Sequence, residues 1–315
     1  MTTTTHTAPP VRQGSTPTRA GRPGRWGRPE EWGVGLCLIA PAVILFCLFS
    51  AYPFGRTVLL SFTDWSGLTP TFNWIGLRNY LTAFSDGVWW ESVGHSLILA
   101  VLALTVMNGI SLGLALALDR KIGAQLFYRT VFYLPPVLSG IVVAIIWKWI
   151  FQPYGGPLNQ LVGAFGLGGH AWLGDESTAL LAVSVASMWQ GVGMPFLLFL
   201  AALQAIPTEL YEAARVDGAG GWRIFRRITL PLMKPTLGVV GIMTLLGAME
   251  MFNLVMAMTG GGPGYSTEVP VLHIYRAAFE HSQFGYASAL SLVFCVLMLV
   301  VASLGLRFTR RKAGE

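Results

Sequence analysis

Two groups of ionisable side chains interrupt an otherwise apolar sequence, and their spacing could support binding chemistry. The first group is Glu212-Ala213-Ala214-Arg215-Val216-Asp217-Gly218, a polar island between two long apolar runs. Charges around two small helix-forming residues can present a surface that a partner in water approaches closely. The second group is Glu250 with its neighbours Phe252 and Asn253, inside an apolar run. A carboxylate at such a position is expensive to bury and is by default a candidate functional group.

No arrangement typical of an enzyme is visible in the sequence. It has no Gly-x-x-x-x-Gly-Lys-Ser/Thr phosphate loop, so we expect that the chain does not hydrolyse ATP itself. It also has no convincing Ser/His/Asp, Cys/His or metal-ligand spacing. The cysteines Cys37, Cys47 and Cys295 lie inside apolar runs and are interpreted as small buried side chains. We therefore expect a protein that is not an enzyme and that binds no metal or cofactor of its own.

The composition indicates an integral membrane protein. Hydrophobic residues make up 53% of the 315 residues and charged residues only 11%, whereas soluble domains carry about 25% charged residues. Six apolar runs reach the roughly 20 residues that a helix needs to cross a bilayer. They are too long, and lack the alternation, for strands of a membrane barrel. The sequence thus predicts an all-α fold of six transmembrane helices, near residues 33–54, 93–118, 130–151, 178–203, 236–259 and 286–308.

The orientation of these spans follows from the lysines and arginines. With a cytoplasmic N-terminus, only four of the 21 Lys and Arg residues fall outside the cell, namely Arg56, Arg78, Lys148 and Arg276. Because Lys and Arg concentrate in cytoplasmic loops, both termini and the loop 205–235 are predicted to be cytoplasmic. His95, His170, His273 and His281 then lie near the outer face, where we expect them to be solvated or interfacial.

The predicted domain organisation has one large domain and two short tails. Residues 1–28 are rich in Arg, Thr and Pro with almost no large apolar side chain, and are expected to be disordered. Residues 29–309 form the six-helix domain, and residues 310–315 a cytoplasmic tail. A cleaved signal peptide within the first 54 residues is a competing interpretation, although its apolar stretch is long for one.

Two spans carry residues that break helices. Pro135-Pro136 interrupts the third span, and Gly191, Gly193 and Pro195 interrupt the fourth. Such breaks are tolerated in membranes where neighbouring helices or a water-filled cavity satisfy the freed backbone groups. They indicate either hinges of a moving protein or static kinks, and both interpretations stay open.

The polar island is expected to form a helix–turn–helix. Thr208 is a suitable N-cap, with acidic residues in the first turn, and Gly218 can adopt the left-handed conformation that ends a helix. A second short helix is expected at 222–229, before Pro231 leads into the fifth span. A docking surface, an amphipathic surface segment and an ordinary loop are all compatible with this pattern. A DNA-binding helix-turn-helix is a remote alternative, because membrane spans lie on both sides.

The spacing Glu-Ala-Ala, three residues, Gly, nine residues, Ile, one residue, Leu-Pro resembles the signature loop of permease subunits of binding-protein-dependent ABC importers. Every position of that pattern is matched, and the loop lies between the fourth and fifth expected spans, as it does in that family. There the loop is a coupling helix that docks the ATPase subunit. The resemblance implies that the ATPase-coupling residues here are Glu212, Ala213, Ala214, Asp217, Gly218, Ile228, Leu230 and Pro231.

Other motifs are similar to the first permease of the carbohydrate-uptake importers, of the maltose and glycerol-phosphate type. They include Arg129-Thr130-Val131-Phe132-Tyr133-Leu134-Pro135-Pro136, Gly156-Pro157-Leu158-Asn159 and Thr259-Gly260-Gly261-Gly262-Pro263. The resemblance extends from about residue 33 to residue 308. The chain lacks the extra N-terminal spans and the large external domain of the maltose-type form.

The resemblance also implies where a substrate passes. In related sugar permeases this part of the fifth span lines the substrate site, which corresponds to Glu250, Phe252 and Asn253. Trp189 and Gln190, beside the break in the fourth span, are further candidates, although packing explains them equally well. Many family members carry a basic residue near position 250 and an acidic one at 253, so the sugar is left open. Alternatively, Glu250 pairs with a partner subunit.

The partners implied by the resemblance are a second homologous permease, a dimer of ATPase subunits that holds ATP and Mg²⁺, an external solute-binding protein and a sugar. The location implied is the cell membrane of a prokaryote, as a multi-pass protein in the lipid bilayer, with no nucleic acid bound. Three alternatives remain: a permease for a solute that is not a sugar, a secondary transporter or channel that works alone, and a membrane receptor that does not transport.

Overall fold

The computed structural model describes residues 29–119 and 125–311. The chain forms two compact units, Met1–Pro53 and Phe54–Glu315. The tail predicted for residues 1–28 and the last residues, 312–315, lie outside the described residues. The same holds for residues 120–124, which include Arg120 and Lys121, two of the cations predicted to be cytoplasmic.

The described part of the first unit, residues 29–53, is a single apolar helical segment. Helix α1 (Pro29–Phe46) continues through the π-helical turn η1 (Cys47–Ala51) into α2 (Tyr52–Leu60), and residues Leu38–Leu60 form a candidate membrane span. None of the side chains described between 38 and 53 is buried. A helix that is apolar on all sides and uncovered by its own unit has a surface suited to lipid or to another membrane helix.

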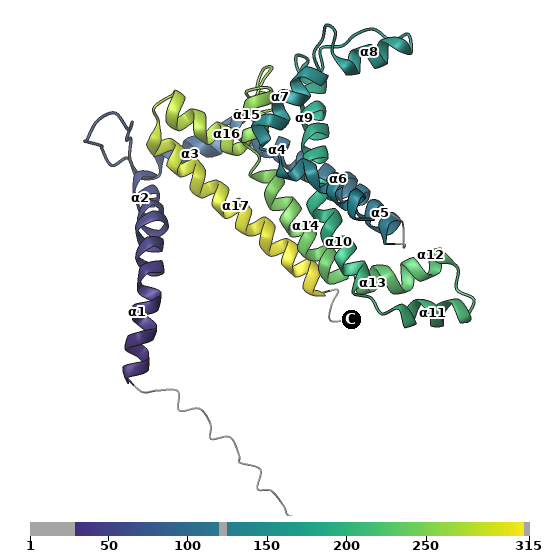
Figure 1. Ribbon diagram of the computed structural model, residues 1–315. Helices are drawn as coiled ribbons and strands as arrows, with labels where there is room; N and C mark the ends of the chain where they lie inside the picture. The colour runs from purple at the N-terminus through teal and green to yellow at the C-terminus, as the bar shows by residue number, and fades with distance from the viewer. Residues whose placement is uncertain (1–28, 120–124, 312–315) are drawn as a thin grey trace, which may run out of the picture. The chain divides into compact units, whose positions relative to one another are not determined.

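The second unit is entirely helical, apart from an isolated bridge between Thr63 and Trp74 in the part of the chain that the structure describes (Figure 1). Its helices are α3 (Arg78–Ser85), α4 (Gly87–Leu102), η2 (Ala103–Met107), α5 (Asn108–Leu118), α6 (Gln125–Val137), α7 (Gly140–Ile150), α8 (Pro157–Ala164), α9 (Glu176–Gly191), α10 (Gly193–Gln204), α11 (Thr208–Val216), α12 (Gly221–Ile224), η3 (Phe225–Thr229), α13 (Leu230–Leu232), α14 (Lys234–Met249), α15 (Asn253–Met258), α16 (Pro270–Tyr275), η4 (Arg276–Glu280) and α17 (Phe284–Arg311).

Three helices of the described chain are individually long and apolar enough to cross a membrane. They are Leu38–Leu60, Gly87–Leu118 and Phe284–Arg307, and they coincide with the predicted first, second and sixth spans. The predicted third and fourth spans correspond to bent helix pairs instead, and a third bent pair joins Gly221–Leu232 to Lys234–Met249, so the described chain has up to six spans if each pair counts as one. Of the third pair, only Lys234–Met249 overlaps the predicted fifth span. The all-helical membrane-type fold is therefore confirmed.

The third span is sharply bent, close to where its prolines predicted a break. Helix α6 continues through Pro135 and Pro136 to Val137, and α7 leaves at an angle of 97°. The Nε2 atom of Gln190 donates a 3.0 Å hydrogen bond to the backbone carbonyl of Leu138, at the break. A neighbouring helix thus satisfies a carbonyl that the break releases.

The fourth span bends by 44° between α9 and α10, at the glycine-rich break that was predicted. The hydroxyl of Ser111, on α5, donates a 2.9 Å hydrogen bond to the carbonyl of Val192 in this break. Gly193 is required here for close approach, because an added Cβ would lie 2.4 Å from the carbonyl oxygen of Phe132.

The fifth span is not the continuous helix predicted for 236–259. Helix α14 ends at Met249, and α15 begins only at Asn253. The residue before α15, Phe252, has φ −124° and ψ −59°, which is not helical. The apolar run did not predict this break because it contains no proline and its three glycines, Gly238, Gly241 and Gly247, all lie within α14.

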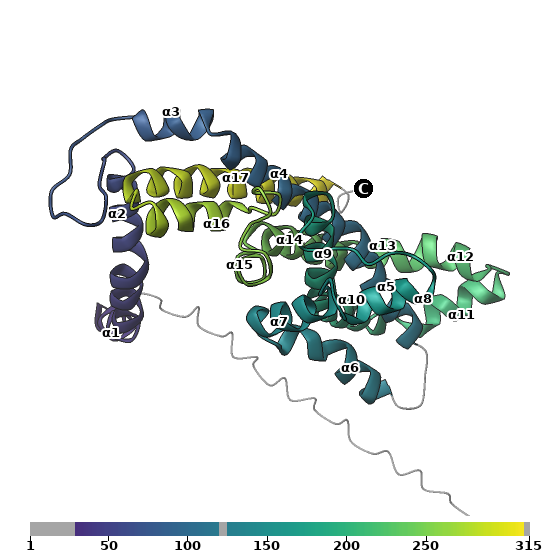
Figure 2. The same cartoon turned by 90° about the horizontal axis from the view of Figure 1, so that it is seen from above.

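Three clusters of buried side chains hold the second unit together, and alanines are frequent in two of them. One joins α7, α9 and α15, the second joins α4 and α17, and the third joins α5 and α10 (Figures 1 and 2). Alanines such as Ala115, Ala186 and Ala289 are fully buried, because small side chains let membrane helices approach closely. Cys47 and Cys295 are exposed on helix surfaces, so the prediction that they are buried was wrong for the isolated chain.

Candidate functional site

The polar island forms an exposed elbow of two helical arms at the end of the second unit away from α8 (Figure 1). The first arm is α11, which ends in a two-bond glycine cap. The N–H of Ala219 donates to the carbonyl of Ala214, and the N–H of Gly218 donates to the carbonyl of Arg215. Gly218 has φ +73°, so the predicted left-handed helix end is confirmed. The predicted N-cap was wrong, because Pro207 occupies the cap position and Thr208 is the first helical residue.

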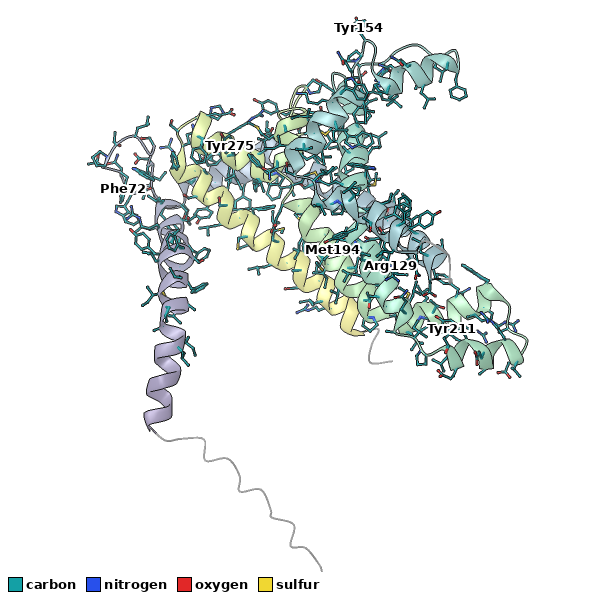
Figure 3. All side chains as sticks on the ribbon, in the orientation of Figure 1. Phe72, Arg129, Tyr154, Met194, Tyr211 and Tyr275 are labelled. Atoms are coloured by element: carbon teal, nitrogen blue, oxygen red, sulfur yellow. The ribbon has the colours of Figure 1, made fainter. Side chains whose placement is uncertain are left out.

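The second arm runs from Gly221 to Leu232 and comprises α12, η3 and α13, so the short helix predicted at 222–229 is longer and contains a π-helical turn. Tyr211 on α11 lies 3.3 Å from the hydroxyl of Thr229 on the second arm, within hydrogen-bonding distance (Figure 3). Thr229 is itself buried. This contact fixes the two arms against each other at the base of the elbow.

The motif residues divide into an exposed set and a half-buried set. Glu212, Ala213, Asp217 and Gly218 are exposed on and just beyond α11. The half-buried set anchors the elbow to the rest of the unit and comprises Ala214, Ile228, Leu230 and Pro231. The exposed set is thus available to a partner in water, whereas the half-buried set packs against the rest of the unit.

An open hollow of about 830 Å³ lies between the elbow and the ends of α5 and α10. Its walls include Tyr211, Arg215 and Trp222 from the two arms and Asp119 from the end of α5. Burial raises the pKa of the Asp119 carboxyl above its ordinary value. The hollow therefore separates part of the elbow from the ends of α5 and α10.

The second predicted site falls on the break in the fifth span. Glu250 follows the last residue of α14, and Asn253 begins α15; both side chains are exposed. Phe252 is half-buried and its ring packs on Tyr275, with centroids 5.3 Å apart. Broken helices that present free backbone groups and polar side chains are typical of substrate sites in transporters.

A row of aromatic rings leads away from this break. Phe252 contacts Tyr275, Tyr275 contacts Phe279, Phe279 contacts Phe284, and Phe284 contacts Trp65, with centroid separations of 5.1 to 5.4 Å. The row connects the break to the loop that precedes α3. Aromatic faces offer apolar contact area, and Phe279 is 64% exposed.

A separate apolar pocket of about 290 Å³ lies where the fourth and fifth spans meet. It is lined by Met107 on η2, Gly191 and Met194 at the fourth-span break, and Thr244 and Met251 near the fifth-span break. The residues predicted to line a substrate site are not among its walls, although Gly191 and Met251 are their immediate neighbours in sequence.

Trp189 and Gln190 are held by contacts within the chain. The ring of Trp189 packs edge-on against Trp147, with centroids 6.0 Å apart, and is 38% exposed. Gln190 is occupied by its hydrogen bond to the carbonyl of Leu138. Both residues therefore have a packing role in the structure.

The sequence interpretation missed a buried ionic cluster near α16. Glu268 is fully buried and forms a 2.7 Å ion pair with Arg276, which also donates to the carbonyl of Gly260. His273 lies 3.2 Å from the carboxylate of Asp86 and 3.6 Å from that of Glu268. This outer cluster joins the start of α4 to α16 and η4. A single Glu in a glycine-rich loop has no sequence pattern that marks it as buried.

The outer cluster shifts the pKa of its histidine. Burial alone lowers the pKa of His273, but the neighbouring carboxylates of Glu268 and Asp86 outweigh burial, and the net pKa is raised. At 3.6 Å the contact with Glu268 is too long for a hydrogen bond, so its contribution is electrostatic. Of the two expectations for His273 and His95, solvated or interfacial, the structure contradicts the first: both side chains are half-buried, and Nδ1 of His95 lies 2.9 Å from the backbone carbonyl oxygen of Glu268.

The apolar, bent helices and the exposed polar elbow of the described residues are those of an integral membrane protein. Residues 109–314 match the family described as "Binding-protein-dependent transport system inner membrane component". The chain belongs to this family. The resemblance stated from the elbow motif is thereby confirmed.

Curated relatives and solved structures agree with the family. The chain is 40% identical over 88% of its length to the "Probable ABC transporter permease protein YurN" of Bacillus subtilis, of which it covers 96%. It is 35% identical over 87% of its length to the "Multiple sugar-binding transport system permease protein MsmF" of Streptococcus mutans, of which it covers 94%. Among solved structures it matches a chain of a bacterial ABC transporter involved in the import of the acidic polysaccharide alginate. The TM-score is 0.78 at 26% identity, with 90% of this chain and 96% of that chain covered.

Proposed function

We propose that this chain is the transmembrane permease subunit of an ATP-driven ABC importer, with six spans and both termini in the cytoplasm. Family membership and the membrane-type helices support the class. The distribution of Lys and Arg supports the orientation, because it places the elbow on the cytoplasmic side.

The observation that carries the proposal is the exposed elbow. Its first arm presents Glu212, Ala213, Asp217 and Gly218 to solvent, while its base is fixed through Tyr211 and Thr229. In this proposal an ATPase subunit grips α11, and closure of the ATPase dimer displaces the elbow as one piece. The second arm continues through α13 into α14, so the displacement reaches the span that contains the Glu250 break.

The proposed substrate is a sugar delivered by an external solute-binding protein. MsmF is named for sugar transport, and the similar structure belongs to a polysaccharide importer. The carboxylate of Glu250 and the amide of Asn253 suit sugar hydroxyl groups, and the aromatic row suits the apolar face of a sugar ring. A carboxylate at the break also repels anions, which favours a neutral saccharide over a phosphorylated one.

The proposed assembly contains a second homologous permease and two copies of the ATPase, embedded in the cell membrane of a prokaryote. ATP and Mg²⁺ belong to the ATPase subunits, and this chain binds no cofactor and no nucleic acid. The exposed apolar surfaces of the described helices, such as Leu38–Leu60, are available to lipid and to the second permease.

Two elbow variants test the coupling proposal in cells that contain the partner subunits. Gly218→Pro removes the φ of +73° that the helix end requires, since proline fixes φ near −65°. Glu212→Lys reverses an exposed charge on α11. Both are expected to abolish uptake and copurification of the ATPase while the chain still inserts into the membrane.

Gly155→Pro is the matched control. Gly155 has φ +74° and, like Gly218, no heavy atom within 4 Å of an added Cβ, but it lies near α8. It should retain the copurified ATPase. Normal uptake by both elbow variants would contradict the proposal.

A second experiment separates this function from that of a stand-alone transporter. Uptake should stop when ATP is depleted and continue with a protonophore while ATP is held constant. The opposite result would favour a secondary transporter. A panel of neutral, phosphorylated and uronate saccharides, tested with wild type and Glu250→Gln, would then identify the substrate class.

A further inference from the structure

The second arm of the elbow, Gly221–Leu232, is hereafter called the cationic arm. It carries three arginines, Arg223, Arg226 and Arg227, and no acidic residue. All three are exposed, and no described carboxylate lies within ion-pairing distance of them. The spacings of three and four residues place them on one side of a helix. The arm therefore presents a concentrated positive face whose counter-charge lies outside the described chain.

The first arm has the opposite charge. Residues 208–217 contain Glu209, Glu212 and Asp217 against a single Arg215. A surface that attracts the cationic arm repels the first arm, so one uniformly charged partner does not suit both. The two arms are consequently expected to contact different surfaces.

The cationic arm also has the geometry of a segment that lies along a membrane surface. It leads directly into α14, and the two helical segments differ in direction by 68°. When α14 crosses the bilayer, the arm therefore runs much closer to the membrane plane than α14 does. Trp222, beside Arg223, is 71% exposed, and its ring packs on Phe225 with centroids 5.6 Å apart. An exposed tryptophan next to arginines is typical of the lipid headgroup region.

We propose that the cationic arm binds the headgroups of anionic phospholipids, with Arg223, Arg226 and Arg227 on the phosphates and Trp222 at the headgroup level. Guanidinium groups match phosphate oxygens with two parallel hydrogen bonds. Basic segments beside a membrane span are attracted to anionic lipid in the cytoplasmic leaflet. The arm thus holds the base of the elbow at the membrane surface while the first arm extends into water.

A lipid-quenching experiment tests this directly. Cys37, Cys47 and Cys295 are replaced by Ala, and Gly221→Cys carries a bimane fluorophore, since an added Cβ at Gly221 has no heavy atom within 4 Å. The full-length chain, with any subunits that copurify, is reconstituted in vesicles of symmetrical composition. These contain spin-labelled phosphatidylglycerol, or phosphatidylcholine with the same spin label.

We expect stronger quenching by phosphatidylglycerol at low ionic strength and equal quenching at high salt. Replacing the three arginines by Gln should lower the phosphatidylglycerol preference at least about fivefold, since each basic residue near an anionic surface contributes about a factor of five. Replacing them by Lys should keep most of the preference. Arg78→Gln, outside the elbow, is the control and should change nothing.

Equal quenching by the two lipids in the wild type would overturn the proposal, as would a preference that survives the triple Gln replacement. If the wild type shows no preference and the triple Gln variant loses a copurifying ATPase subunit, the cationic arm is a protein contact instead.

Discussion

The elbow and the outer cluster both concentrate ionisable residues, but the molecule treats them in opposite ways. On the elbow, Glu212 and Asp217 are exposed and make no ion pair with any described residue. In the outer cluster, Glu268 is fully buried and paired with Arg276. Exposed charges contribute little to stability and are available for binding, whereas buried charges become structural because they cannot be left unpaired.

The largest expected effect breaks the buried pair. Arg276→Met leaves the Glu268 carboxylate buried without its partner, which typically costs about 3–5 kcal/mol of unfolding free energy. Thermal unfolding of the purified chain in detergent measures this loss. Glu280→Gln is the control, because Glu280 is exposed and its contact with Arg276 is long, at 3.7 Å. Loss of this contact should change stability little. Equal stability of Arg276→Met and wild type would show that the pair is not structural.

Two glycine substitutions compare the regions with matched backbone strain. Gly261 (φ +87°) and Gly218 (φ +73°) are both left-handed, so Ala at either position is strained by about 1–3 kcal/mol. At Gly261 the added Cβ would also lie 2.1 Å from the Glu268 carboxylate, whereas at Gly218 nothing lies within 4 Å. Gly261→Ala should therefore lower the unfolding temperature more than Gly218→Ala. The reverse order would contradict the tight packing of the outer cluster.

The outer cluster should also make stability depend on pH. Because the pKa of His273 is raised in the folded chain, its contribution is complete below the ordinary histidine pKa of about 6.5 and is lost as pH rises through the folded pKa. As pH rises from about 6.5 through the folded pKa of His273, the unfolding temperature of wild type minus that of His273→Gln should therefore decrease. A difference that stays constant with pH would mean that folding does not shift the pKa of His273, and a difference that increases with pH would mean that folding lowers it.

The smallest expected effect lies on the elbow. Glu212→Gln removes an exposed charge that has no ion-pair partner among the described residues. The free energy of unfolding should therefore change by no more than about 0.5 kcal/mol. Copurification of the ATPase should nevertheless weaken. A large loss of stability with unchanged ATPase binding would show that the elbow is structural like the outer cluster.

The sequence predicted best what depends on local pattern. Apolar length identified the helices near the three single spans, and Pro135, Gly191 and Gly193 marked the regions of two bends. Gly218 ended α11 as predicted, since the left-handed helix end is a local property of glycine.

The sequence predicted least well what depends on contacts far apart in the chain. The break before Asn253 carries no helix-breaking residue, and α15 instead packs against α7 and α9 in a shared cluster of buried side chains. The outer cluster brings Asp86 within 3.2 Å of His273, which is 187 residues away. No local pattern predicts such a pair. The sequence therefore marked Arg276 only as a cation outside the cell and did not single out Glu268.

The two bends in the third and fourth spans are linked through hydrogen bonds. Gln190 on α9 supplies the donor for the carbonyl at Leu138, and the carbonyl of Val192, at the next bend, receives its donor from Ser111 on α5. Separating α9 from the end of α6, or α10 from α5, would leave one of these carbonyls without a hydrogen-bond donor in an apolar environment. A movement that keeps both hydrogen bonds must therefore displace these segments together as one block.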